Sequence, residues 1–208
     1  MSDTKEKILG AALGLFARDG YEAVSVSTIA AELGITKGAL YKHFKNKRDI
    51  FDSIVEKMYS YDKSISQENE MPEHEYETEQ SAYKNISAES IKEFTLAQFR
   101  FWTKDAFAVN YRRMVMLEQY RSAELAELYG ASFLWGPVHY MEDVFRTMAE
   151  EKSITTGKSP RQLAFEFYAP LGFLINLSDA SENAAELEAM LKRHMEDFFK
   201  EIKEERLN

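Results

Sequence analysis

Residues 28–47 constrain the fold of this chain more than any other segment. The sequence there is TIAAELGITKGALYKHFKNK, and its larger apolar residues form two pairs spaced four apart, Ile29 with Leu33 and Leu40 with Phe44. Residues four apart share one face of a helix, so the two stripes can pack against each other. Gly34 between them suits the left-handed backbone that ends a helix. The segment predicts two short helices joined by a sharp turn.

The second of these helices carries a face suited to DNA. If Leu40 and Phe44 point inward, the opposite face presents Lys37, Gly38, Tyr41 and Lys42, with His43 near its edge. Residues 35–48 contain five cationic side chains and no acidic one, as phosphate binding requires. The alternatives are a solvated basic face, and Tyr41 and His43 that only pack against neighbouring helices.

The charge distribution supports a local basic surface. The 208-residue chain has a net charge of −9, whereas residues 1–50 hold eight Lys and Arg against six Asp and Glu, a net charge of +2. Nucleic-acid binding depends on the local patch rather than on the net charge. A basic N-terminal segment is thus predicted beside an acidic remainder.

Residues 4–58 closely resemble the N-terminal domain of TetR-family transcriptional repressors. The resemblance rests on an amphipathic first helix, on the exit FARDGY at 16–21, on Leu33-Gly34-Ile35, and on GALYKHFKNK at 38–47. It implies a homodimer, a three-helix DNA-binding domain, and a separate helical domain that binds a small molecule and then releases DNA.

The resemblance also implies roles for particular residues. Ser25 is the expected cap of the second helix, near a phosphate, Ser27 matches a DNA-contacting position, and Lys47 matches a phosphate anchor. The remaining positions that match contacts with bases or backbone are Thr36, Lys37, Gly38, Ala39, Tyr41, Lys42 and His43.

The rest of the chain predicts further helices, so the fold class is all-α. A helix that starts near residue 47 connects to a segment with six Glu and no Lys or Arg at 64–83, which predicts a loop; its His74 is expected to be solvated rather than a metal ligand. Further helices are expected at 88–106, 108–119, 122–151, 160–178 and 183–204, with kinks or breaks at Gly136-Pro137 and Pro170. The predicted organisation is a helix-turn-helix DNA-binding domain at 1–46, a connecting helix at 47–65, an acidic loop at 66–85, and a larger C-terminal ligand-binding and dimerisation domain at 86–208.

Aromatic and methionine side chains are dense between residues 94 and 145, which favours an adaptable apolar pocket over packing alone. Any single member of that set can equally be core. The candidate ligand-binding residues are Trp102, Tyr111, Glu118, Tyr120, Trp135, His139, Tyr140 and Phe173. The expected effector is a small lipophilic molecule, and nearby carboxylates leave a lipophilic cation open.

The last two helices are predicted to form the homodimer interface. Their apolar stripes contain Leu163, Phe167, Leu171, Leu174, Ile175, Leu187, Met190, Leu191, His194, Phe198, Phe199 and Ile202. Dimerisation also follows from DNA recognition, because one short helix reads too little sequence and a twofold axis places two such helices about 34 to 36 Å apart.

Several classes of protein and site are disfavoured. The chain has no cysteine, only four histidines, and neither a phosphate loop nor a nucleophile elbow, so we expect no enzyme, no cofactor and no metal. No apolar run is long enough for a membrane helix, and a cytoplasmic protein is expected. The expected function is a ligand-released repressor of palindromic double-stranded DNA. The alternative is a DNA-binding protein whose C-terminal domain docks a protein partner.

Overall fold

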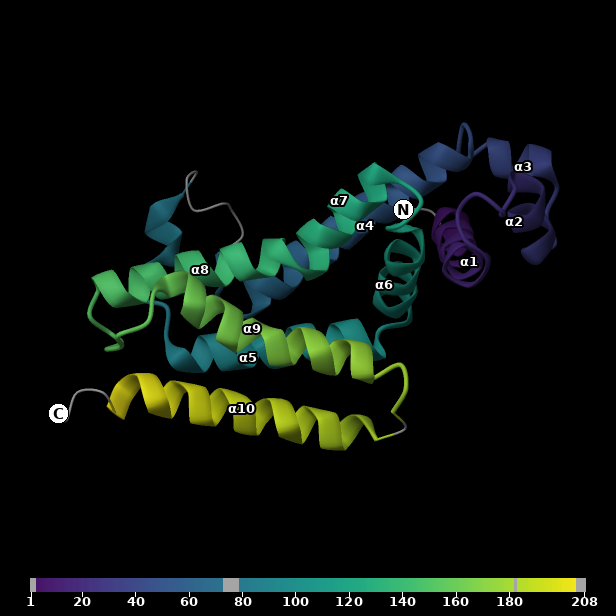
Figure 1. Cartoon of the computed structure of the whole chain (residues 1–208). Helices are drawn as coiled ribbons and strands as arrows, with labels where there is room; N and C mark the ends of the chain where they lie inside the picture. Colours follow the sequence, from purple (N-terminus) through teal and green to yellow (C-terminus); the bar gives the residue numbers. More distant parts are fainter. Residues whose placement is uncertain (1–2, 73–78, 182, 205–208) are drawn as a thin grey trace. The chain divides into compact units, whose positions relative to one another are not determined.

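The computed structural model describes residues 3–72, 79–181 and 183–204, and every regular element within these ranges is a helix (Figure 1). The all-α prediction is confirmed for these residues. The chain divides into two compact units. The first unit comprises Met1–Asp62 and Lys104–Tyr129, and the second comprises Lys63–Thr103 and Gly130–Asn208. No helix in the described ranges is long and apolar enough to cross a membrane.

The first unit contains the predicted helix-turn-helix. Its helices are α1 (Asp3–Asp19), α2 (Val26–Glu32), α3 (Lys37–Tyr41), the start of α4 (Lys47–Glu68), α6 (Ala106–Glu118) and the start of α7 (Ala123–Phe133). α1 packs against both α2 and α6, and α2 packs against α3. The core of this unit includes Ile8, Leu9, Phe16, Ile29, Leu40, Phe44 and Ile54, all buried.

The turn between α2 and α3 forms as the sequence predicts. Gly34 has φ +64°, and the amide of Ile35 donates to the carbonyl of Ala30 at 2.9 Å, which closes the end of α2. Ser25 caps α2 by accepting from the amide of Thr28 at 3.1 Å, and Thr36 caps α3 by accepting from the amide of Ala39 at 3.1 Å. Because both caps are local, this geometry follows from the sequence itself.

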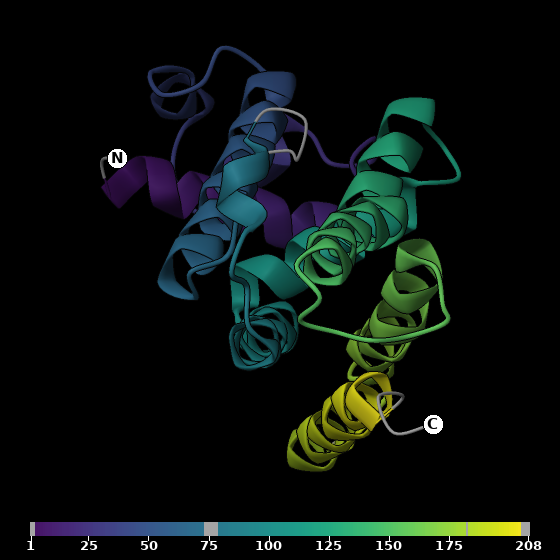
Figure 2. The same ribbon diagram turned by 90° about the vertical axis from the view of Figure 1, so that its left-hand side faces the viewer.

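The second unit contains the end of α4, the short 3₁₀ helix η1 (Gln80–Tyr83), α5 (Ala88–Lys104), the end of α7, α8 (Trp135–Glu150), α9 (Pro160–Leu177) and α10 (Ala184–Glu204). α9 packs against α8 and α10, and α9 and α10 run antiparallel side by side in both views (Figures 1 and 2). Phe145, Phe167, Phe198 and Phe199 form an aromatic core between these three helices, with ring centroids 5.1 to 6.4 Å apart.

Most helices begin and end within two residues of the expected positions, and the larger departures lie around the predicted loop. The connecting helix α4 continues to Glu68 instead of ending near residue 65, and η1 forms inside the segment predicted to be a loop. The segment expected at 122–151 is divided into two helices, α7 and α8, at Leu134, close to the break predicted at Gly136-Pro137. Pro170 lies inside α9, which continues to Leu177. The rest of the predicted acidic loop, including His74, lies outside the described residues.

The break between α7 and α8 leaves no room for a side chain at Gly136. A Cβ atom on Gly136 would lie 1.8 Å from the carbonyl oxygen of Ala131, which is too close for any side chain. Pro137 follows in the first turn of α8, where a missing amide proton costs no helical hydrogen bond. Tyr168 of α9 donates its hydroxyl to the carbonyl of Phe133 at 3.0 Å and so satisfies one acceptor at the end of α7.

Gly136→Ala is therefore expected to destabilise the protein by about 1–3 kcal/mol, the usual cost of forcing extra atoms into a filled site. Gly130→Ala is the matched control, because Gly130 is helical and nothing lies within 4 Å of its added Cβ. That control should be neutral or stabilising by up to about 1 kcal/mol. Chemical denaturation of both variants measures the difference, and equal stabilities would contradict the steric account.

Candidate nucleic-acid interface and effector site

The outward face of α3 is accessible. Lys37, Gly38 and Lys42 are exposed and the Tyr41 side chain is 47% exposed, whereas Ala39 and His43 are half-buried. Leu40 and Phe44 on the opposite face are buried, as predicted. Ser25, Ser27 and Thr36 are also exposed, at the starts of α2 and α3. Nine of the ten predicted DNA-contacting residues therefore lie on α2, on α3 or within two residues of them.

The five predicted cations divide into two groups. Within the described residues, the ammonium groups of Lys37, Lys42 and Lys45 make no ion pair, and all three side chains are exposed. Arg48 instead forms ion pairs with Asp52 and Glu124. Its hydrogen bonds lower the pKa of the Glu124 carboxyl below its ordinary value. Three lysines of the run are thus available to phosphate without breaking an internal contact.

Lys47, the predicted phosphate anchor, has internal partners. Its ammonium donates to the carbonyl of Tyr21 at 2.8 Å and to that of Glu22 at 3.4 Å, and it lies 4.2 Å from the centre of the Tyr21 ring. The side chain is only 22% exposed. The Glu22 carboxylate lies 3.8 Å from the same ammonium, so a phosphate bound by its third N–H donor would compete with Glu22.

The eight predicted ligand-binding residues are divided between the two units. Tyr111, Glu118 and Tyr120 belong to the first unit; Tyr111 and Glu118 are buried, and Tyr120 is 89% exposed. Glu118 accepts from the backbone amide of Tyr21 at 3.1 Å and pairs with Arg121 at 3.0 Å. The carboxylate that was expected to meet a ligand is therefore already engaged within the first unit.

The other five belong to the second unit and differ in burial. Trp102 is buried, with its ring centroid 4.6 Å from that of Phe133. Tyr140 is half-buried and donates its hydroxyl to the carbonyl of Pro72 at 3.1 Å. Trp135, His139 and Phe173 are exposed, and the rings of Trp135 and His139 stack at 6.4 Å. Of these five residues, Trp135 and His139 contact each other.

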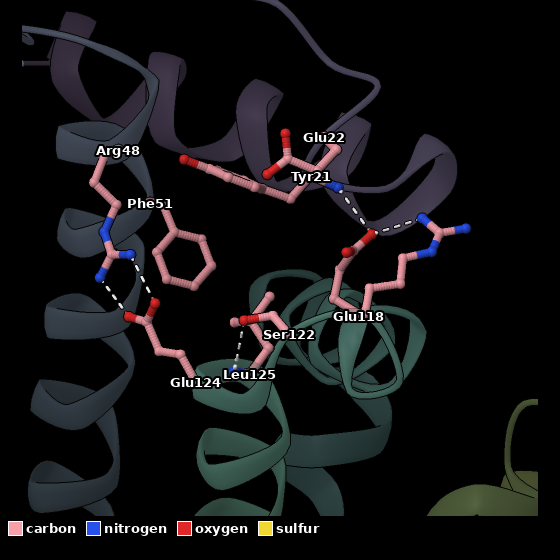
Figure 3. A pocket seen from close by; sticks show the side chains of 9 residues that line it. Tyr21, Glu22, Arg48, Phe51, Glu118, Ser122, Glu124 and Leu125 are labelled. Atoms are coloured by element: carbon pink, nitrogen blue, oxygen red, sulfur yellow. Dashed lines mark hydrogen bonds and ion pairs between the residues drawn. The ribbon is translucent and has the colours of Figure 1, made fainter.

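A pocket of about 140 Å³ lies in the first unit (Figure 3). It is lined by Tyr21, Glu22, Arg48, Phe51, Glu118, Arg121, Ser122, Glu124 and Leu125. Only Glu118 was among the predicted ligand-binding residues. The pocket brings together the end of α1, the start of α4 and the corner between α6 and α7, which no helical periodicity could have revealed. In the described part of the chain, no three His, Asp or Glu side chains come together as a metal site would require.

Comparisons with known proteins agree with the helix-turn-helix described above. Residues 8–54 match the family described as "Bacterial regulatory proteins, tetR family". Over 54 residues, 26% of this chain, the sequence is 44% identical to the HTH-type transcriptional regulator AcrR of Shigella flexneri. That match spans about a quarter of the relative's length, 25%.

Two solved structures share the fold along nearly the whole chain. SmeT, the repressor of the Stenotrophomonas maltophilia multidrug efflux pump SmeDEF, has a TM-score of 0.63 and 19% identity, with 96% of this chain and 90% of SmeT covered. The transcriptional regulator FadR from Bacillus subtilis, solved in complex with stearoyl-CoA, has a TM-score of 0.64 and 21% identity, with 93% and 97% covered. The N-terminal segment of this chain therefore belongs to the TetR family of bacterial regulatory proteins, and the chain shares the fold of these two proteins.

Proposed function

We propose that the protein is a transcriptional repressor that binds palindromic operator DNA as a homodimer and is released by a small lipophilic effector. The observation that carries the proposal is the exposed face of α3, where Lys37 and Lys42 flank Tyr41 on a helix capped by Thr36. A capped helix with an accessible basic face is the arrangement that enters a major groove. This activity requires no catalytic group, so the protein is proposed not to be an enzyme. It is proposed to act on DNA in the cytoplasm.

The proposed DNA contacts are those of the ten predicted residues, of which seven are exposed while Ala39, His43 and Lys47 are half-buried. Lys37 and Lys42 are placed to meet guanine acceptors, Tyr41 to donate to phosphate, and Ala39 to contact a thymine methyl group. Lys47 is proposed to use its remaining N–H donor on a phosphate while it holds the carbonyl of Tyr21.

The homodimer is proposed to form through α9 and α10, as expected, but mostly through other residues than those of the predicted stripe. The predicted stripe is largely core: Leu163, Phe167, Leu171, Leu174, Ile175, Leu187, Leu191, Phe198, Phe199 and Ile202 are all buried within the second unit. His194 is half-buried, with its Nε2 atom 3.1 Å from the carbonyl oxygen of Phe167. Met190 of the predicted stripe is 50% exposed, and outside that stripe Phe165 and Phe173 of α9 are 58% and 65% exposed, which supports a partner at these residues.

An effector is proposed because two proteins with this fold were solved in complex with organic ligands, FadR with stearoyl-CoA, which has a long acyl chain, and SmeT with triclosan. The aromatic side chains of α5 and α8, among them Trp102 and Tyr140, remain the proposed lining. Release is allosteric in the strict sense: an effector that binds better to a dimer unable to span two grooves must lose affinity by the same factor when DNA binds.

Salt titration tests the DNA-binding proposal. A duplex selected by the protein from a random-sequence pool should bind with steep salt dependence, and Lys42→Gln should lower the slope of log affinity against log salt by about 0.9 for each phosphate that the variant no longer neutralises. Lys42→Gln should also change base preference. Lys84→Gln is the matched control, since Lys84 is exposed and far along the chain from α3. Failure to select any duplex would contradict the proposal.

Release by one class in a panel of lipophilic acids, cations and neutral aromatics would support the effector. Binding to DNA that no small molecule disturbs would favour the alternative in which a protein partner docks on the C-terminal region.

A further inference from the structure

Both main-chain polar groups of Tyr21 are held by charged side chains from other helices. The amide of Tyr21 donates to Oε1 of Glu118, at the end of α6, at 3.1 Å. The carbonyl of Tyr21 accepts from the ammonium of Lys47, at the start of α4, at 2.8 Å. One residue of the α1–α2 connection is therefore fixed between α6 and α4, and all of these groups belong to the first unit.

The end of α6 lies directly against this connection. Glu118 is 1% exposed, and its carboxylate is satisfied by the amide of Tyr21 and by the guanidinium of Arg121 at 3.0 Å. Gly20 has φ +88°, and a Cβ atom there would lie 2.7 Å from Oε1 of Glu118. A buried carboxylate without partners is costly, so this contact strongly favours the observed spacing of α6 and residue 21.

The same connection leads straight into the DNA-binding helices. The Tyr21 ring packs edge-on against Phe16 of α1 and Phe51 of α4, at 5.1 and 5.2 Å between centroids. Ser25, the cap of α2, follows only four residues later. Few rotatable backbone bonds separate Tyr21 from α2, so a displacement of Tyr21 is expected to move α2. Because α2 packs on α3, α3 would move as well.

The hydrogen bonds of this connection lie next to a cavity. Beside Glu118 lies the pocket of about 140 Å³, with Tyr21, Phe51 and Leu125 around it (Figure 3). On the other side of the pocket Arg48 reaches Glu124 through two hydrogen bonds, one of 2.8 Å. Because the pocket lies beside these hydrogen bonds, the loss of one bond can let the α1–α2 connection move into the pocket while the core of the unit stays packed.

We propose that Glu118 is a positioning residue for DNA binding, which fixes the α1–α2 connection against the end of α6 and thereby sets the position of α2 and α3. This assignment replaces the effector contact predicted for Glu118. It rests on the proposed function, because its consequence is measured as DNA affinity.

The test compares four variants with the wild-type protein on a duplex that the wild type selects from a random pool. Glu118→Met removes the acceptor but keeps an unbranched side chain of similar size, and Glu118→Gln restores an acceptor. Arg121→Ala removes only the partner that orients Glu118, and its side chain is 56% exposed, so the fold is retained. Glu127→Ala removes one exposed carboxylate from α7 and is the control for charge.

Glu118→Met is expected to bind at least about tenfold more weakly than the wild type, the loss that corresponds to one hydrogen bond to a charged group. The slope against salt should stay unchanged because every phosphate remains neutralised as in the wild type. Glu118→Gln should recover most of the affinity, Arg121→Ala should fall in the same direction, and Glu127→Ala should match the wild type. Thermal melting measures the folded fraction of each variant, and each affinity is calculated for the concentration of folded protein.

Wild-type affinity of the folded fraction in Glu118→Met would overturn the inference, even if its melting temperature fell, because the role would then be structural only. If Glu118→Met does not fold, wild-type affinity in Arg121→Ala overturns it instead. A reduced slope would also overturn it, since that identifies a direct phosphate contact. If the wild type selects no duplex, the proposed function itself fails. If the wild type selects a duplex and the variants bind it with the same affinity, only the role of Glu118 fails.

Discussion

Replacing Phe165 and Phe173 together by aspartate is expected to make the protein monomeric and to weaken operator binding by more than about 100-fold, the advantage that two linked binding heads ordinarily provide. The two residues are eight positions apart on α9, so they share one face, and both are more than half exposed. Two carboxylates on this face would have to be desolvated in the proposed dimer, which is strongly unfavourable. Analytical ultracentrifugation measures the oligomeric state, and operator titration measures the affinity.

The control is a double variant with the same change of charge at exposed aromatic residues elsewhere, Tyr59→Asp with Tyr120→Asp. Their side chains are 59% and 89% exposed. This control should remain dimeric and keep most of its affinity. A Phe165→Asp, Phe173→Asp protein that stayed dimeric would show that the partner covers another face.

Phe167→Ala is expected to lower the free energy of unfolding by about 3–5 kcal/mol, the usual cost of removing a fully packed phenylalanine. Phe167 is 2% exposed and contacts Phe145, Phe198 and Phe199 at 5.7, 5.1 and 5.8 Å between ring centroids. The cavity would open at the meeting point of α8, α9 and α10. Chemical denaturation measures the loss.

Tyr120→Ala provides the comparison, because a side chain that is 89% exposed loses little on truncation and should change stability by less than about 0.5 kcal/mol. A loss below about 1 kcal/mol for Phe167→Ala would mean that the aromatic cluster is not a core. It would then belong with the interface that the sequence predicted for this stripe.

The helix-turn-helix could be predicted because its determinants are local. Ser25, Gly34 and Thr36 act on amides and carbonyls within a few residues, and the spacing of Leu40 and Phe44 fixes the inward face of α3. The break near Gly136-Pro137 is local as well. The exposure of Lys37, Tyr41 and Lys42 followed from the same periodicity.

The interior and the outer face of the last two helices could not be told apart from their sequence. Periodicity identifies an apolar stripe, but it does not say whether another helix of the chain or a second copy covers it. Phe167 and Phe198 are covered by α8 and by each other, while Phe165 and Phe173, on a different face, are left exposed.

The sequence by itself determined the fold class, the capped helix-turn-helix and its basic face, because short-range hydrogen bonds and side-chain spacing encode them. Only the tertiary structure decided which charges are engaged. Lys47 and Glu118 looked available for phosphate and effector, yet they hold the two main-chain groups of Tyr21, 26 and 97 residues away along the chain. The physical reason is that a charged side chain takes its partner from whatever folding brings near it, and sequence separation does not reveal that neighbour.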